Sequence, residues 1–311
     1  MSAAGRGLLA AFALGVALSG APPARAAFTG AEEHGRMIRS GAVSLYLEVR
    51  GSGAGTPLLV VNGGPGFGHD YVHCSGAWDV LAKKRRVAFY DQRGTGRSTP
   101  VKPGAPCTLA QQIDDLDAVR AALGADQVDL LGHSWGGYLV MAYAARHPQH
   151  IRHLMIVDSA APKWSETEFI FKYIFPEGLE KQAGLQFAEA FGDSTARKQD
   201  LREYFAMLFY DTAHRDEFLR RGGDYAYSTV VNGAIGADLE KYDLNPELAK
   251  FRFPSLVVTG RYDINVAPST AWKIHQKIPN SQFVVFEKSG HIPYFEEPEK
   301  FVSTIEDFLA H

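Results

Sequence analysis

The sequence has little net charge, few cysteines and no internal repeat. Its 32 Lys and Arg residues against 35 Asp and Glu residues give a formal net charge of -3, without the basic surplus typical of nucleic-acid binding. The two cysteines lack His or Cys neighbours at the spacing of a zinc site. The apolar run from Leu8 to Leu18 is too short to span a bilayer. We therefore expect no metal, no cofactor, no nucleic-acid partner and no stable membrane insertion of the mature protein.

The first 26 residues differ from the rest of the chain. Arg6 precedes the apolar run, and Ala24-Arg25-Ala26 resembles a signal-peptidase cleavage site. This pattern predicts a secretory signal peptide over residues 1–26 and a secreted or periplasmic protein, with an uncleaved anchor as the alternative. Its removal takes away two arginines and no acid, so the formal charge moves from -3 to -5.

Export affects how the cysteines are interpreted, because disulfides form in oxidising compartments. Cys74 and Cys107 follow the ends of two strands that we expect to be neighbours. A bridge between them would stabilise the fold by about 3 to 4 kcal/mol. We expect this disulfide, with two separate buried thiols as the alternative.

Apolar segments of strand length alternate with helical patterns after residue 26. Strands are expected at residues 58–61, 86–90, 127–131, 151–157, 254–260 and 281–287 after a hairpin at 37–50, and helices at 108–123 and 301–309. This order predicts an α/β fold: a mostly parallel, doubly wound sheet with helices on both faces.

Residues 161–250 interrupt the alternation of strands and helices. The segment is rich in aromatic residues and reads as helical, for example over 198–210. We interpret it as a helical cap inserted between two parts of one core, residues 27–160 and 251–311. Aromatic side chains of the cap are expected to line an apolar pocket.

The segment Gly132-His133-Ser134-Trp135-Gly136-Gly137 follows a predicted strand and opens a predicted helix. A Gly-x-Ser-x-Gly turn in that position forces its serine into a strained conformation and exposes the hydroxyl above the sheet. The following helix directs its positive end toward any negative charge that forms on a substrate. Ser134 is therefore the candidate nucleophile.

A serine nucleophile needs a histidine base and a carboxylate that orients the base. On this kind of turn the partners follow in the order Ser, acid, His, each after a strand. Asp263 and His291 fit that order and lie after the strands expected at 254–260 and 281–287. Weaker candidates are Asp129 and Asp158 for the acid. His133 reads as a packed residue of the turn.

The negative oxygen of an acyl-transfer intermediate needs hydrogen-bond donors. The backbone N-H of Trp135, directly after the nucleophile, is one expected donor. The second should come from the loop after an earlier strand, here Asn62-Gly63-Gly64-Pro65-Gly66-Phe67-Gly68. We predict that Gly64 supplies it.

Four segments together resemble the proline iminopeptidase family of α/β-hydrolases: NGGPGFGHDY at 62–71, YDQRGTGRS at 90–98, GHSWGG at 132–137 and Gly290-His291. The segment at 91–98 is the most specific of them. From the residues alone we expect segment 90–98 to be structural, with Arg93 and Arg97 joining neighbouring loops. The resemblance implies the α/β-hydrolase fold and an acyl-enzyme mechanism.

Two positions depart from the family. Asn62 stands where the family usually has His, and Asn232 lies near the position where it has an acidic residue for the substrate ammonium group. Asn62, Asn232 and the cap residue Glu203 are the candidate substrate-binding residues.

The sequence thus predicts a serine hydrolase that acts on a small molecule or short peptide. The resemblance implies cleavage of an N-terminal apolar residue, as a proline iminopeptidase does. The alternative is a carboxylesterase or lactonase, and the remote one is a non-catalytic binding protein with this fold.

Overall fold

A single sheet organises the computed structural model, which describes residues 35–193, 195–221 and 225–311. The predicted signal peptide lies outside the described residues. Within them the eight strands run in the order β1-β2-β4-β3-β5-β6-β7-β8. The strands are β1 Gly35–Ser40, β2 Val43–Arg50, β3 Leu58–Val61, β4 Val87–Tyr90, β5 Val128–His133, β6 Ile151–Val157, β7 Ser255–Gly260 and β8 Gln282–Phe286.

The sheet begins with a hairpin and continues as a parallel sheet. Strand β1 pairs antiparallel with β2 and β2 pairs antiparallel with β4, while the pairs from β4 through β3 to β8 are parallel. Every residue of β3, β4, β5 and β7 is buried. Strands covered on both faces are apolar along their whole length, and that property allowed the sequence to predict them.

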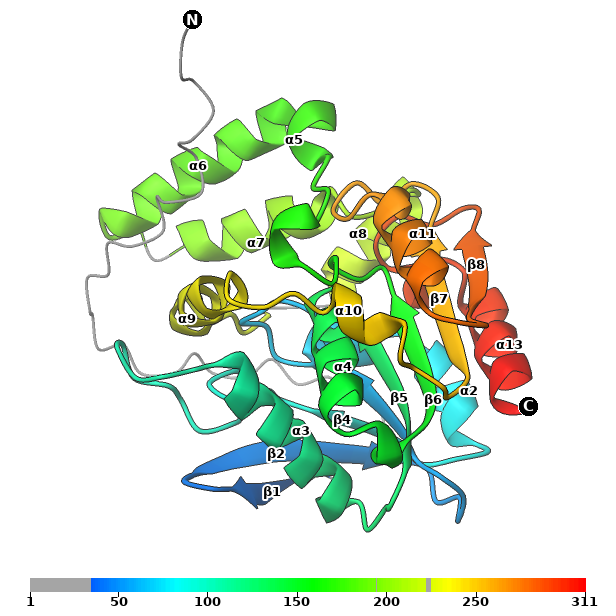
Figure 1. Cartoon of the computed structure of the whole chain (residues 1–311). Helices are drawn as coiled ribbons and strands as arrows, with labels where there is room; N and C mark the ends of the chain where they lie inside the picture. Colours follow the sequence, from blue (N-terminus) through cyan, green and yellow to red (C-terminus); the bar gives the residue numbers. More distant parts are fainter. Residues whose placement is uncertain (1–34, 194, 222–224) are drawn as a thin grey trace, which may run out of the picture.

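Helices cover both faces of the sheet (Figure 1). They are α1 Asp70–His73, α2 Ala77–Ala82, α3 Leu109–Ala122, α4 Trp135–Arg146, α5 Phe171–Ile174, α6 Pro176–Ala190, α7 Ala196–Ala206, α8 Thr212–Arg221, α9 Thr229–Leu239, α10 Asn245–Leu248, α11 Pro268–Lys277, α12 Pro293–Glu296 and α13 Pro298–Leu309, with 3-10 turns at Pro148–His150 and Trp164–Glu166. Helices α3, α4 and α11 pack into one apolar cluster, and α2 and α13 pack into the other. None of the described helices has the length and hydrophobicity needed to cross a membrane.

Helices α5 to α10 occupy the stretch between β6 and β7, where the sequence predicts the cap. Figure 1 shows α6 and α7 at the end of the sheet toward which β6 and β8 point. The helix expected over 198–210 is α7, which ends at Ala206. After the helix, the backbone N-H groups of Tyr210 and Asp211 donate to Glu296 Oε1 and so join this segment to the core.

Candidate active site

A sharp turn at Ser134 joins β5 to α4. Ser134 has φ 59° and ψ -122°, a conformation that residues other than glycine rarely adopt. A Cβ atom on Gly132 would lie 2.3 Å from the carbonyl oxygen of Gly136, and one on Gly136 would lie 2.2 Å from that of Val61. The glycines therefore make the turn possible, as the sequence predicts, and Ser134 stands at the carboxyl end of β5.

The structure brings His291 and Asp263 together in the interior. His291 Nδ1 lies 2.7 Å from Asp263 Oδ2. The other carboxylate oxygen, Oδ1, accepts the backbone N-H groups of Asn265 and Val266, both at 2.9 Å. On the far side of the imidazole, Asn265 Nδ2 donates to His291 Nε2 at 3.1 Å. His291 thus carries its proton on Nδ1 and presents a lone pair on Nε2, which is the tautomer of a general base.

A chain of hydrogen bonds connects this histidine to the loop after β3. His133 Nε2 donates to the backbone oxygen of His291 at 2.7 Å. The hydroxyl of Tyr71 donates to His133 Nδ1 at 2.9 Å and accepts the backbone N-H of Gly63 at 2.6 Å. Burial lowers the pKa of His133 well below its ordinary value, so this ring is neutral. His133 is a packed residue of the turn, as predicted, and Tyr71 is a connection that no sequence signal indicated.

Asn62 shapes the loop that holds the expected second oxyanion donor. Its Nδ2 donates to the carbonyl oxygens of Gly63 and Phe67, both at 2.9 Å. A trans peptide directs its C=O and N-H groups to opposite sides. Asn62 therefore fixes the peptide plane between Gly63 and Gly64 and turns the N-H of Gly64 away from its own side chain. The structure gives the buried amide of Asn62 a role in shaping this loop, and a contact of Asn62 with substrate stays a prediction.

Gln92 joins the two halves of the predicted oxyanion hole. Its Nε2 donates to the backbone oxygen of Asn62 at 2.8 Å, and its Oε1 accepts the indole N-H of Trp135 at 2.9 Å. The side chain of Gln92 has no solvent exposure. One buried amide thus holds both the loop after β3 and the first residue of α4.

The model of the alpha/beta hydrolase fold matches residues 56–298. A proline iminopeptidase of Heyndrickxia coagulans is 31% identical over 270 residues, which cover 83% of this chain and 92% of that protein. This chain is a proline iminopeptidase-like α/β-hydrolase. The proline iminopeptidase of Saccharolobus solfataricus is 29% identical over 280 residues, covering 86% and 89% of the two chains. The fold and family predicted from the sequence are therefore confirmed, and this serine hydrolase is an enzyme.

Solved structures of two enzymes are similar to the hydrolase. The proline iminopeptidase of Mycobacterium smegmatis has 26% identity and a TM-score of 0.67, covering 89% of this chain and 97% of that one. An esterase from Thermogutta terrifontis has 25% identity and a TM-score of 0.68, covering 89% and 98%. Both a peptidase and an esterase therefore share the architecture of this hydrolase.

The other two candidate substrate-binding residues lie in the cap. Glu203 on α7 forms an ion pair with Lys181 on α6 at 2.6 Å. Its charge is therefore already balanced within the cap. Asn232 is half-buried in the first turns of α9, where its backbone N-H donates to the oxygen of Ser228 at 3.1 Å.

The expected disulfide is absent from this hydrolase. Cys74 and Cys107 are both free and buried. Cys74 belongs to the apolar cluster on the face of α2 and α13, whereas Cys107 belongs to the cluster on the face of α3 and α4. The sheet lies between the two clusters, so the prediction of a bridge was wrong and the alternative of two separate thiols holds.

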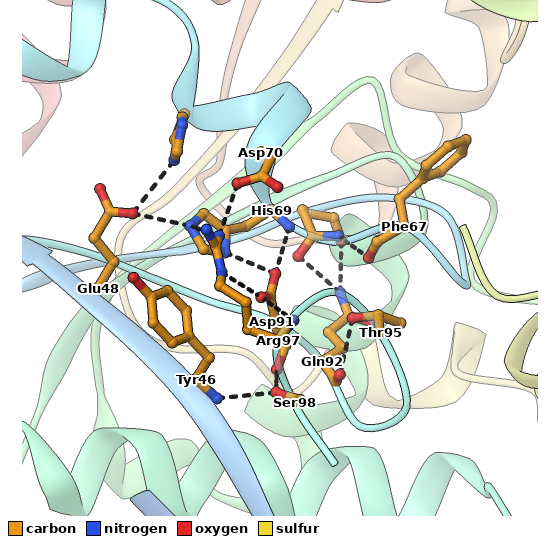
Figure 2. A network of polar contacts seen from close by, with 12 residues as sticks. Tyr46, Glu48, Phe67, His69, Asp70, Asp91, Gln92, Thr95, Arg97 and Ser98 are labelled. Atoms are coloured by element: carbon orange, nitrogen blue, oxygen red, sulfur yellow. Dashed lines mark hydrogen bonds and ion pairs between the residues drawn. The ribbon is translucent and has the colours of Figure 1, made fainter. Parts of the chain in front are cut away.

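The segment from Tyr90 to Ser98 is a structural centre, as predicted (Figure 2). Asp91 accepts the ring N-H of His69 at 2.8 Å through Oδ1 and the backbone N-H of Arg97 at 2.8 Å through Oδ2. The Arg97 guanidinium also reaches Asp70 at 2.7 Å. The second expected tie is a bidentate pair from Arg93 to Asp115 on α3, at 2.8 and 2.7 Å.

Three groups of described side chains have a spacing that could hold a metal ion. They are Glu48 with His69 and His73, Asp117 with His147 and His150, and Asp158 with Asp263 and His291. In the first group both ring nitrogens of His69 already face carboxylates, at 2.8 Å and 3.1 Å. In the third group Asp263 already holds the Nδ1 proton of His291. The expectation of a metal-free hydrolase remains a prediction.

The buried His69 gives a prediction about alkaline stability. Burial opposes its charge, but Asp91 and the hydrogen bond to Glu48 outweigh burial and raise the pKa of His69 from 6.5 to about 9. The stabilisation from the protonated ring is complete below pH 6.5 and is lost as the pH rises through about 9. We expect the free energy of unfolding to fall by about 3 kcal/mol over this window. Urea unfolding of wild type and His69→Gln at several pH values checks this. If the free energy of unfolding changes equally with pH in the two proteins, the prediction is contradicted.

Glu296 is a residue of the site that sequence reasoning missed. Its Oε2 accepts the backbone N-H of Gly290 at 2.7 Å, next to His291. Its Oε1 accepts the backbone N-H groups of Tyr210 and Asp211, which follow α7 in the cap. Burial raises the pKa of Glu296 to about 7. One carboxyl group thus ties the cap to the loop of His291, and nothing in the local sequence indicated these long-range partners.

Proposed function

We propose that this hydrolase is an exported enzyme that uses Ser134, His291 and Asp263 as a catalytic triad. The observation that carries the proposal is the 2.7 Å contact of His291 Nδ1 with Asp263. This pair lies beside the strained turn of Ser134, because His133 of that turn donates a hydrogen bond to the backbone oxygen of His291. Export rests on the predicted signal peptide at residues 1–26.

In this mechanism His291 Nε2 accepts the proton of Ser134 while the serine oxygen attacks the substrate carbonyl. Nε2 has one lone pair, and Asn265 donates to it in the resting site. The Ser134 hydroxyl must therefore displace Asn265 before the proton moves. The backbone N-H groups of Gly64 and Trp135 stabilise the oxyanion, and water then hydrolyses the acyl-enzyme.

The substrate that we propose first is a small peptide or amide with an apolar N-terminal residue. The curated relatives described above support this choice, because they are named proline iminopeptidases. An aromatic group beside the oxyanion loop also supports it. The ring centroid of Phe67 lies 4.6 Å from that of Tyr227 and 6.2 Å from that of Tyr204 in the cap, and in this proposal the aromatic group packs against the proline ring of the substrate.

A small apolar ester or lactone is the second candidate. A desolvated ammonium group without an acidic partner is very costly. Glu203 is paired with Lys181, and the side chain of Asn232 carries no charge. These two observations favour a substrate without a free amino terminus.

A substrate profile of the mature enzyme separates the two candidates. We expect prolyl arylamide to be cleaved with a kcat/KM at least about tenfold above that of short aryl esters. The reason is that contacts between the proline ring and the aromatic group around Phe67 lower the barrier to the reaction. Ester turnover without arylamide turnover would establish the second candidate.

A fluorophosphonate probe tests the mechanism independently of the substrate. Wild type should be labelled and Ser134→Ala should not, since only an activated serine reacts. An unlabelled wild type would contradict the triad itself.

A further inference from the structure

A second buried carboxyl group lies beside the proposed triad. Asp158 directly follows β6 and has a φ of 45°, a conformation rare for residues with a side chain. Its Oδ1 accepts the backbone N-H of Gly260 at 2.8 Å, which holds the side chain against the end of β7. Asp158 is only 1% exposed. Asp158 is therefore a buried acid that one backbone hydrogen bond holds at the end of the sheet.

The position of Asp158 brings it close to both Asp263 and His291. One carboxylate oxygen from each aspartate and one ring nitrogen of His291 all lie within 4.8 Å of one another. Asp158 Oδ2 is buried, and no N-H or O-H group of the described residues donates to it. Two carboxylates this close cannot both be ionised at low cost in the interior.

The hydrogen bonds decide which of the two acids carries the charge. Asp263 accepts three N-H groups, from Asn265, Val266 and the ring of His291. Asp158 accepts one N-H group, from Gly260, and its only other donor among the described residues is the neutral hydroxyl of Thr259. Because donors stabilise the ionised form, Asp263 is the carboxylate. Burial and then the charge of Asp263 raise the pKa of Asp158 well above its ordinary range.

Among the described residues, the remaining groups around this pair supply no positive charge that would balance a second carboxylate. Thr259 donates its hydroxyl to the oxygen of Gly260. Tyr294, from α12, and Tyr204, from α7, are both buried phenols whose pKa is raised, first of all by burial. His133 is neutral because burial lowers its pKa. The pair therefore faces one basic group, His291, and carries one negative charge.

We propose that Asp158 is a positioning residue, whose neutral carboxyl donates a hydrogen bond from Oδ2 to Asp263. The proposal rests on the proposed function, in which Asp263 orients His291 for Ser134. The proton stays on Asp158 throughout turnover. The hydrogen bond from Asp158 partly neutralises the charge of Asp263 and so limits how strongly Asp263 stabilises protonated His291. His291 can therefore return its proton to the leaving group.

Asp158→Asn is the decisive variant. The amide oxygen can still accept the N-H of Gly260 and the amide nitrogen can still donate to Asp263, while asparagine tolerates positive φ. We expect kcat/KM to stay within about threefold of wild type and the acid limb of its pH profile to stay in place. If Asp158 were ionised, the substitution would remove a negative charge near His291 and move the acid limb down by about one pH unit or more. That shift would overturn the proposal.

Asp158→Leu removes the donor while keeping a similar shape. We expect kcat to fall about tenfold and the acid limb to move upward, because Asp263 then holds protonated His291 more strongly. An unchanged acid limb in a folded protein would mean that Asp158 is only structural. The matched control is Asp129→Leu, at a buried aspartate at the start of β5 that contacts His153 Nδ1 at 2.7 Å. It should lower the melting temperature and leave the acid limb unchanged.

An infrared measurement tests the protonation of Asp158 without using activity. The difference spectrum between wild type and Asp158→Asn at neutral pH should contain the band of a protonated carboxyl group. Its absence would overturn the proposal even if the triad is correct. Conversely, failure of the fluorophosphonate probe to label wild type would contradict the proposed function while the band still reports on Asp158.

Discussion

Replacing Asp263 by asparagine is expected to lower kcat by about four orders of magnitude. The carboxylate now accepts the Nδ1 proton of His291. An amide nitrogen in its place would donate to Nδ1 and leave the proton on Nε2. His291 could then no longer accept the proton of Ser134. Steady-state kinetics on the best substrate, with thermal melting to verify folding, measures the effect.

The chain offers a close control for this substitution. Asp129 is also a buried aspartate that contacts a histidine Nδ1 at 2.7 Å, here that of His153. It lies at the start of β5, whereas Asp263 follows the end of β7. We expect Asp129→Asn to keep kcat within about threefold, because only Asp263 serves the reacting histidine. Similar losses of kcat in both variants would point to general destabilisation.

The second large effect is expected for Gln92→Leu. Leucine is similar in size but leaves the backbone oxygen of Asn62 and the indole N-H of Trp135 without their partner. The two expected oxyanion donors, on Gly64 and Trp135, then lose their common support. We expect kcat to fall about a hundredfold with KM within about twofold of wild type, since the oxyanion forms only in the transition state.

Gln112→Leu is the matched control for that change. Gln112 is a fully buried glutamine of α3, and its amide contacts Cys107 Sγ at 3.5 Å. It should cost stability without a selective loss of kcat. If Gln92→Leu raises KM and leaves kcat unchanged, Gln92 acts on substrate binding and the interpretation fails.

Local pattern was sufficient for much of the fold. Buried parallel strands are apolar throughout, so β3, β4, β5 and β7 were predicted within a few residues. Ser134 was predictable because a strained turn between strand and helix requires glycines at fixed positions. Asp263 and His291 were predictable because parallel strands bring their carboxyl ends to one edge of the sheet. The structure places the two side chains in contact there.

Other features depended on partners far away in the sequence. The two cysteines were expected to pair, yet they belong to opposite faces of the sheet. Asn62 was expected to contact substrate, and the structure shows its amide donating hydrogen bonds to the backbone oxygens of Gly63 and Phe67 in its own loop. The helix expected over 198–210 ends at Ala206, and the N-H groups of Tyr210 and Asp211 donate to Glu296, more than eighty residues away along the chain.

The sequence by itself determined the fold class and the family, and it predicted the three residues of the proposed triad. Each of these depends on short-range periodicity or on the order of loops along a parallel sheet. Only the tertiary structure decided that Gln92 joins both parts of the predicted oxyanion hole and that Asp158 lies beside Asp263. The reason is physical: hydrogen-bond partners and the burial that sets protonation are determined by three-dimensional neighbours, which a linear pattern does not contain.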